Sequence, residues 1–227
     1  MIQLNNVVKI YNKGTSSAVA ALNGVTLTIG DGEFVSIMGP SGSGKSTLLH
    51  ILGCMDTMTE GEYELDGIRV QDLKPERLHK IRGSKISFVF QQFALMNTYT
   101  VFENVELPLL SQKVGKKERK RIVNEKLNQL GIADLSRKLP GKISGGQQQR
   151  TAIARALASG SSIILADEPT GALDQHTSQE VMEVLKEINE EGKTIIIVTH
   201  DPNIASRTKR CIQIVDGRIV EDSPVLS

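Results

Sequence analysis

A glycine-rich segment directly after a short apolar stretch restricts the fold of this chain more than any other feature. The apolar stretch, Phe34 to Met38, predicts a buried strand. After it the chain reads Gly39-Pro40-Ser41-Gly42-Ser43-Gly44-Lys45-Ser46-Thr47. From Lys45 onward, apolar residues recur at helical spacing, which predicts a helix. Strand, glycine loop and helix in this order are the context that a phosphate-binding P-loop requires.

The residue types in this loop suit a nucleoside triphosphate with Mg²⁺. Glycines let the backbone fold tightly, so that successive N–H groups face a polyphosphate. The N-terminus of the following helix adds a partial positive charge. Lys45 would reach the β- and γ-phosphates, and the hydroxyl of Ser46 would coordinate Mg²⁺.

An acidic pair, Asp167-Glu168, follows the apolar stretch from Ile163 to Ala166. The end of a parallel strand is where such sheets bind ligands, so Asp167 is the expected carboxylate partner of Mg²⁺. Glu168 would point toward the γ-phosphate, where a carboxylate can orient or deprotonate the attacking water. Taken alone, the pair could equally form a turn before Pro169; the P-loop favours the functional interpretation.

A second glycine motif, Ser144-Gly145-Gly146-Gln147, opens another stretch of helical periodicity. Ser144 suits an N-cap, and exposed amides at Gly145 and Gly146 would suit an anion. Because the chain already has one phosphate loop, the natural ligand of the second is a γ-phosphate held by another subunit. The competing interpretation is a simple helix start with flexible glycines.

Alternation of strands and helices predicts the fold class. Strands are expected at residues 85–90, 162–166 and 194–199, with a helix between the last two, which indicates a mostly parallel α/β sheet. Short strands separated by Gly and Asn, at residues 2–10, 22–29 and 61–70, predict an antiparallel flank.

Two further segments complete the predicted organisation. Asp216-Gly217 between two apolar stretches predicts a β-hairpin. Between residues 93 and 160 strand signals fade, and Lys116 to Leu130 predicts one long polar helix. We therefore expect an α/β core made of residues 1–92 and 161–227, with a helical subdomain, 93–160, inserted in it.

Composition excludes several other classes of protein. The net charge is +1, which gives no field directed at nucleic acid, and the basic run Lys116 to Arg121 is interpreted as a solvated helix face. Fully apolar runs have at most five residues, whereas a bilayer crossing needs about 20. Two cysteines are too few for a disulfide framework and are expected to be reduced thiols. The chain is therefore not expected to enter a membrane by itself.

Together these motifs resemble the ATPase subunit of an ABC transporter, from Ile2 to about residue 222. Ile143 to Gln147 resembles the signature motif of that family, and Ile163 to Asp167 with Glu168 resembles its Walker B strand and catalytic base. Ile143 departs from the leucine that usually opens the signature.

The resemblance assigns roles to four more residues. Tyr11 is similar to the aromatic residue that stacks on adenine, and Gln91 to the glutamine that senses Mg²⁺ and couples the site to the membrane subunits. Asp174, in Gly171-Ala172-Leu173-Asp174, is similar to the loop residue at the dimer interface. His200 is similar to the switch histidine that contacts the γ-phosphate.

The resemblance also implies substrate, partners and location. It implies ATP and Mg²⁺, a homodimer that forms on ATP binding, a separate integral-membrane permease and a place at the cytoplasmic face of the membrane. Segments such as Glu103 to Leu109 resemble the lipoprotein-release and macrolide-efflux branch, whose members often work with an extracytoplasmic adaptor. Met96 to Thr100, where family members touch the permease, is more polar than usual in that branch.

Other functions stay open at this point. One is an ABC ATPase that moves no solute and instead activates an envelope enzyme. ATPases of DNA repair, chromosome organisation and ribosome-bound factors are disfavoured, since they would need a long coiled coil or a second ATPase unit. An adenylate-type P-loop kinase does not account for Ser144 to Gln147 together with Glu168.

Overall fold

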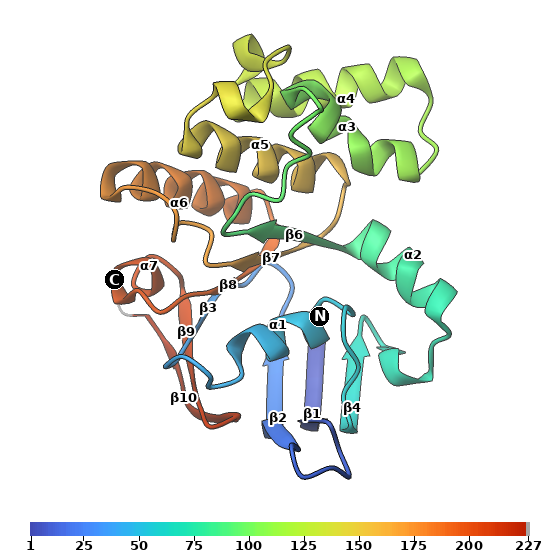
Figure 1. The fold of residues 1–227 in the computed structure, drawn as a ribbon, viewed down its shortest axis with the longest axis vertical. Helices are drawn as coiled ribbons and strands as arrows, with labels where there is room; N and C mark the ends of the chain where they lie inside the picture. Colours follow the sequence, from blue (N-terminus) through green and yellow to red (C-terminus); the bar gives the residue numbers. More distant parts are fainter. Residues whose placement is uncertain (226–227) are drawn as a thin grey trace.

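The computed structural model describes residues 1–225, so residues 226–227 of the predicted core segment 161–227 lie outside it. Two sheets and a helical layer make up the fold (Figure 1). In the view of Figure 1, helices α3 to α6 lie above the larger sheet, and helix α1 with the smaller sheet lies below it.

The larger sheet has six strands in the order β10-β9-β3-β8-β7-β6. All neighbours are parallel except β10 and β9, which form the predicted hairpin. The fold class predicted from the alternation of strands and helices is thereby confirmed. The strands are β3 (Phe34–Met38), β6 (Ile86–Phe90), β7 (Ile163–Asp167), β8 (Thr194–Val198), β9 (Arg210–Val215) and β10 (Arg218–Pro224).

The central strands are apolar on both faces because both faces are covered. In β8, Ile196 and Val198 pack in a core with α1 and the smaller sheet, whereas Ile195 and Ile197 pack in a core with the helices. The helical layer therefore shares its core with the sheet.

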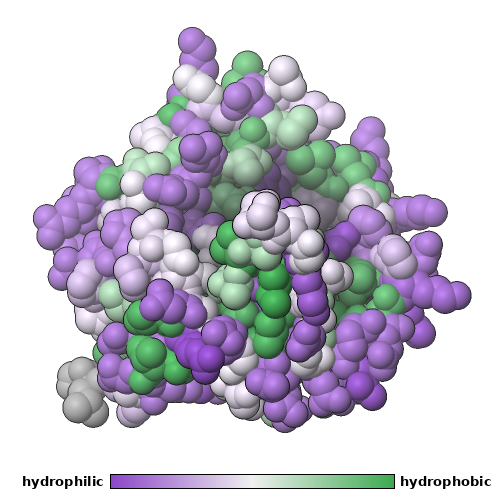
Figure 2. Space-filling model, turned by 60° about the horizontal axis from the view of Figure 1, so that its bottom comes forward, coloured by the Kyte–Doolittle hydropathy of each residue, from purple (hydrophilic) through white to green (hydrophobic). Residues whose placement is uncertain are grey.

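The smaller sheet is antiparallel, with the order β2-β1-β4-β5, and forms the flank expected from the sequence. Its strands are β1 (Ile2–Tyr11), β2 (Val19–Ile29), β4 (Glu60–Leu65) and β5 (Ile68–Arg69). The face turned forward in Figure 2 carries mostly hydrophilic residues, with hydrophobic ones in small separate patches.

The helices differ more from expectation than the strands do. Between β6 and β7 lie α3 (Val101–Ser111), α4 (Lys116–Gln129) and α5 (Gly145–Ala158), of which α4 matches the predicted polar helix. Elsewhere lie α1 (Lys45–Leu52), α2 (Pro75–Lys85), α6 (Gln175–Glu190) and α7 (Pro202–Ala205). No helix was predicted at α2 or α7, and α3 lies in the segment predicted to be helical without having been located there. Among residues 1–225, none of these helices combines the length and the apolar character that a membrane crossing requires.

Candidate functional site

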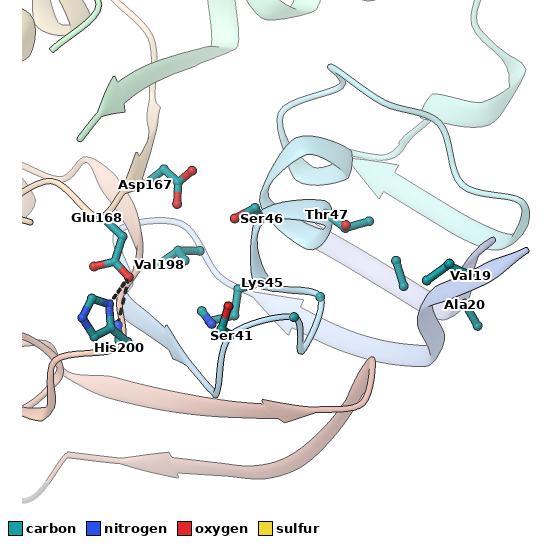
Figure 3. A pocket seen from close by; sticks show the side chains of 13 residues that line it. Val19, Ala20, Ser41, Lys45, Ser46, Thr47, Asp167, Glu168, Val198 and His200 are labelled. Carbon is teal, nitrogen blue, oxygen red and sulfur yellow. Dashed lines mark hydrogen bonds and ion pairs between the residues drawn. The ribbon is translucent and has the colours of Figure 1, made fainter. Parts of the chain in front are cut away.

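A pocket of about 610 Å³ lies at the carboxyl ends of β3, β7 and β8 (Figure 3). It joins the P-loop to the acidic pair and to His200, as the sequence predicts for the edge of a parallel sheet. Its lining is Val19, Ala20, Ala21, Ser41, Gly42, Gly44, Lys45, Ser46, Thr47, Asp167, Glu168, Val198 and His200.

The pocket has two chemically different ends. In Figure 3, Val19 and Ala20 on β2 lie on one side of the P-loop, and Glu168 and His200 lie on the other. A nucleotide has the same division into an apolar base and a charged phosphate chain. Sequence reasoning missed the three lining residues of β2, Val19, Ala20 and Ala21, because the strand that it predicted began only at residue 22.

The first turn of α1 keeps its amide groups free of side-chain caps. Gly44 is the N-cap, with φ 100°, and no side chain hydrogen-bonds there. A Cβ at Gly44 would lie 2.3 Å from the backbone oxygen of Ala21, so only glycine fits. The turn between β9 and β10 supports the loop from below, since Gly217 N donates to Ser43 O at 3.0 Å.

Lys45 points back across its own loop. Its Nζ donates to the carbonyl oxygens of Gly39 and Pro40, each at 2.7 Å. An ammonium has three donors, so this arrangement fixes the side chain and leaves one donor for a phosphate.

Ser46 and Asp167 bring two hard oxygen donors to the same pocket. Burial raises the pKa of the Asp167 carboxyl, Glu168 beside it adds to the effect, and the neighbouring side chains of His50 and Lys45 oppose it. A bound cation would lower the free energy needed to keep the Asp167 carboxyl ionised. Within residues 1–225 no group of three or more His, Cys, Asp or Glu side chains could hold a metal. A hydroxyl and a carboxylate are the oxygen donors that suit Mg²⁺, which is commonly held by one or two protein groups together with phosphate oxygens.

Glu168 and His200 form a close pair at the end of β7 and β8. His200 Nδ1 lies 2.6 Å from Glu168 Oε1, which also accepts from His200 N at 3.1 Å. Thr199 Oγ1 donates to the other carboxylate oxygen at 3.2 Å. Glu168 has φ 46°, an uncommon backbone conformation for this residue type and one often found at functional sites. The carboxylate is thus held in one orientation beside the P-loop.

Several predicted site residues do not line this pocket. Tyr11 donates its hydroxyl to Asp56 and stands opposite Val19 on the neighbouring strand. Gln91, just after β6, packs so closely on Gly171 that a Cβ there would lie 2.6 Å from Gln91 Nε2. Asp174 caps α6 and accepts from Thr177 N at 3.0 Å. The roles given to these residues stay predictions.

Ser144 to Gln147 also lie outside the pocket lining, and their turn is closed by their own side chains. Ser144 Oγ accepts from Gln147 N at 3.3 Å, and Gln147 Oε1 accepts from Ser144 N at 3.0 Å. Gly146 is buried, so the expectation of exposed amides at both glycines is wrong for Gly146. Glycine is required there because a Cβ would lie 2.3 Å from Thr177 Cγ2 on α6.

One buried contact that sequence reasoning missed connects α5 with the acidic pair. Gln149, fully buried on α5, donates its Nε2 to Pro169 O at 2.6 Å. Pro169 directly follows Glu168, so the helix that begins at Ser144 reaches the backbone of the catalytic candidate.

Comparisons with known proteins agree with this geometry. The sequence profile described as ABC transporter matches residues 22–171. The ABC transporter ATP-binding protein MJ0796 of Methanocaldococcus jannaschii is 51% identical over 96% of this chain and 95% of its own. The macrolide export ATP-binding/permease protein MacB of Hyphomonas neptunium is 45% identical; the match spans 98% of this chain but 34% of that protein.

A solved structure extends the likeness to the whole chain. The dimeric post-hydrolysis structure of the ATP-binding cassette MJ0796, bound to ADP and Pi, has a TM-score of 0.90 and 48% identity, with both chains covered completely. Similarity to an ATP-binding cassette thus explains why one fold carries a P-loop, an acidic pair and a separate Ser-Gly-Gly-Gln turn. The chain belongs to the ABC transporter family, as one of its ATP-binding and ATP-hydrolysing domains.

Proposed function

We propose that this chain is the ATPase subunit of an efflux or lipoprotein-release system, and that it closes as a head-to-tail homodimer around two ATP–Mg²⁺ units. The observation that carries the dimer is that Ser144 to Gln147 lie outside the pocket formed by the P-loop of the same chain. A second copy could place its Ser144 turn over that pocket. The dimer of MJ0796 with ADP and Pi supports the arrangement.

Within each site, the position of each residue determines its role. The P-loop amides and the third donor of Lys45 would hold the phosphates. Ser46 and Asp167 would hold Mg²⁺, with Gln91 as a third ligand from outside the pocket lining, and the ion would neutralise phosphate charge. Glu168 Oε1 lies within hydrogen-bond distance of two nitrogens of His200, whereas Oε2 accepts from Thr199 Oγ1 at 3.2 Å; Oε2 is therefore the oxygen that takes the proton of the attacking water. The imidazole of His200 would contact the γ-phosphate from the same end of the pocket.

ATP favours the closed dimer because the γ-phosphate contacts both copies. After hydrolysis and loss of phosphate that contact is gone, and the dimer opens. A ligand shifts such an equilibrium only through contacts that differ between the two states, and the γ-phosphate supplies them here.

The permease docks where the helical layer meets the sheet. A groove of about 350 Å³ lies between α2 and β6 on one side and α3 and α5 on the other. Near it, after Gln91, Met96 and Tyr99 are large side chains with 49% and 40% exposure. The name of MacB, an ATP-binding/permease protein, supports a membrane partner at the cytoplasmic face and an efflux function; an extracytoplasmic adaptor would complete the assembly.

Replacing Glu168 with Gln tests the catalytic assignment. The Glu168→Gln variant should bind ATP, lose turnover by about a factor of 1,000 and form a stable dimer with ATP in size-exclusion chromatography. Normal turnover in this variant would refute Glu168 as the base.

A charge at the predicted interface tests the head-to-tail arrangement. Ser144→Arg should abolish turnover and ATP-dependent dimers while leaving ATP binding by the monomer unchanged. Weaker binding by the monomer would instead assign Ser144 to its own chain's site. For the membrane partner, a neighbouring gene for a four-span permease with a large extracytoplasmic domain supports efflux, whereas a six-span importer permease overturns it.

A further inference from the structure

One cluster beside the pocket is not explained by phosphate binding. Lys9 on β1 is 9% exposed, and its Nζ lies 4.7 Å from the centre of the Tyr11 ring. The same Nζ donates to Asp56 Oδ1 at 2.6 Å and to Thr57 O at 2.7 Å. Tyr11 Oη donates to the other oxygen of Asp56 at 2.8 Å. Lysine and tyrosine are thus held to one carboxylate and to each other.

The cluster is attached to the helix that begins at the P-loop. The amides of Met55 and Asp56 donate to His50 O, in the last turn of α1, at 2.8 and 3.3 Å. Burial would raise the pKa of the Asp56 carboxyl, but the hydrogen bonds from Lys9 and Tyr11 outweigh it and hold that pKa below its usual range. Asp56 therefore stays a carboxylate at neutral pH and keeps the ammonium in place.

We propose that Lys9 is a positioning residue for the purine base of ATP: its ammonium covers one face of the Tyr11 ring, so that adenine stacks on the opposite face. This inference rests on the stacking of adenine on Tyr11 that the family resemblance predicts. The ring has 37% exposure, and its cross-strand partner Val19 is 58% exposed and lines the base end of the pocket.

Two physical effects make the ammonium important for the base. A cation over one face of an aromatic ring draws π density toward itself, which lowers the repulsion between that ring and a second ring on the other side. Lys9 and Asp56 also fix the ring before the base arrives, so less conformational freedom is lost on binding. Neither effect acts on the phosphates.

The test compares a ligand that has a base with one that lacks it. Dissociation constants of ATP and of inorganic tripolyphosphate, both with Mg²⁺, are measured by calorimetry on the wild-type chain, Lys9→Met and Lys9→Gln. Lys9→Met keeps most of the side-chain volume without the charge, and Lys9→Gln keeps a donor for Asp56. Both variants should raise the dissociation constant of ATP about three- to tenfold and leave that of tripolyphosphate unchanged. This size matches the strength of a partly buried cation–π contact.

The other outcomes decide against the inference. An equal loss for both ligands would give Lys9 a merely structural role, and wild-type affinity for ATP in Lys9→Gln would show that the charge is not needed. Tyr11→Ala separates the stacking of adenine on Tyr11 from the role of Lys9. If Tyr11→Ala weakens the binding of ATP but not of tripolyphosphate, while both Lys9 variants bind ATP as the wild type does, only the role of Lys9 fails. If Tyr11→Ala leaves ATP unchanged, adenine stacking fails and the role of Lys9 fails with it.

Discussion

The first turns of two helices that begin beside glycines, α1 after the P-loop and α5 after Ser144, are built differently. At α1, Gly44 has a left-handed backbone and no side chain caps the turn. At α5, Ser144 and Gln147 cap each other reciprocally, and Gly146 is glycine because α6 packs against it. The first turn of α1 thus leaves its amides free of side-chain caps, whereas at α5 the amides of Ser144 and Gln147 are already paired with side chains.

The largest effect is expected from Gly44→Ala. The new Cβ would need a left-handed backbone and would lie 2.3 Å from a main-chain oxygen that cannot move aside. ATP binding by the monomer should fall by at least about 100-fold, since the phosphate amides would be displaced. Titration with a fluorescent ATP analogue measures this. Binding within tenfold of wild type would mean that the loop is not built around this glycine.

Gly146→Ala should have a smaller effect that can be reversed. Its Cβ would meet the Cγ2 methyl of Thr177, 2.3 Å away, so turnover should fall about tenfold while monomer binding of ATP is kept. Thr177→Ser removes that methyl and keeps the hydroxyl that donates to Asp174, so the double variant should recover turnover. Steady-state ATPase assays on the two single variants and the double variant measure whether turnover recovers. No recovery would refute the packing explanation for this glycine.

Gln149→Leu tests the link from α5 to the acidic pair. Losing the bond to the Pro169 carbonyl should lower the free energy of unfolding by about 1–3 kcal/mol and turnover by about tenfold, because Glu168 precedes that carbonyl. Denaturant titration and ATPase assays measure the two quantities. Gln148→Leu is the control, since half-buried Gln148 makes only a 3.3 Å bond to Ile143 O. Equal losses of turnover in both variants would contradict the link.

The smallest effect is expected from removing the hydroxyl group of a helix N-cap, which can be compared at two capping boxes. Thr100 and Glu103 at α3 cap each other just as Ser144 and Gln147 do at α5. Thr100→Ala and Ser144→Ala should each lower the free energy of unfolding by about 1 kcal/mol. Only Ser144→Ala should also lower ATP turnover, because only that hydroxyl is assigned to a phosphate. Equal turnover in the two variants would leave Ser144 as a helix cap and nothing more.

Local sequence signals predicted the elements with strong periodicity or turn chemistry. The strand before the P-loop, the helix after it and the hairpin at Asp216-Gly217 all appear where expected, and both hairpin residues have positive φ. Helix α3 carried a readable signal in the spacing of Thr100 and Glu103, which was overlooked. Helix α2 has a weak amphipathic pattern and only Ile81 buried, so periodicity alone could not show it.

The sequence by itself determined the phosphate loop, the acidic pair and the family, because residues adjacent in the chain carry that chemistry and can be recognised from their order alone. Only the tertiary structure decided which residues meet. It brings His200 onto Glu168, Gln149 onto Pro169 and Asp56 onto Lys9. These contacts depend on strand order and helix packing, which periodicity and spacing along the chain do not encode. For the same reason Gly146 could be recognised as a motif residue but not as a packing one.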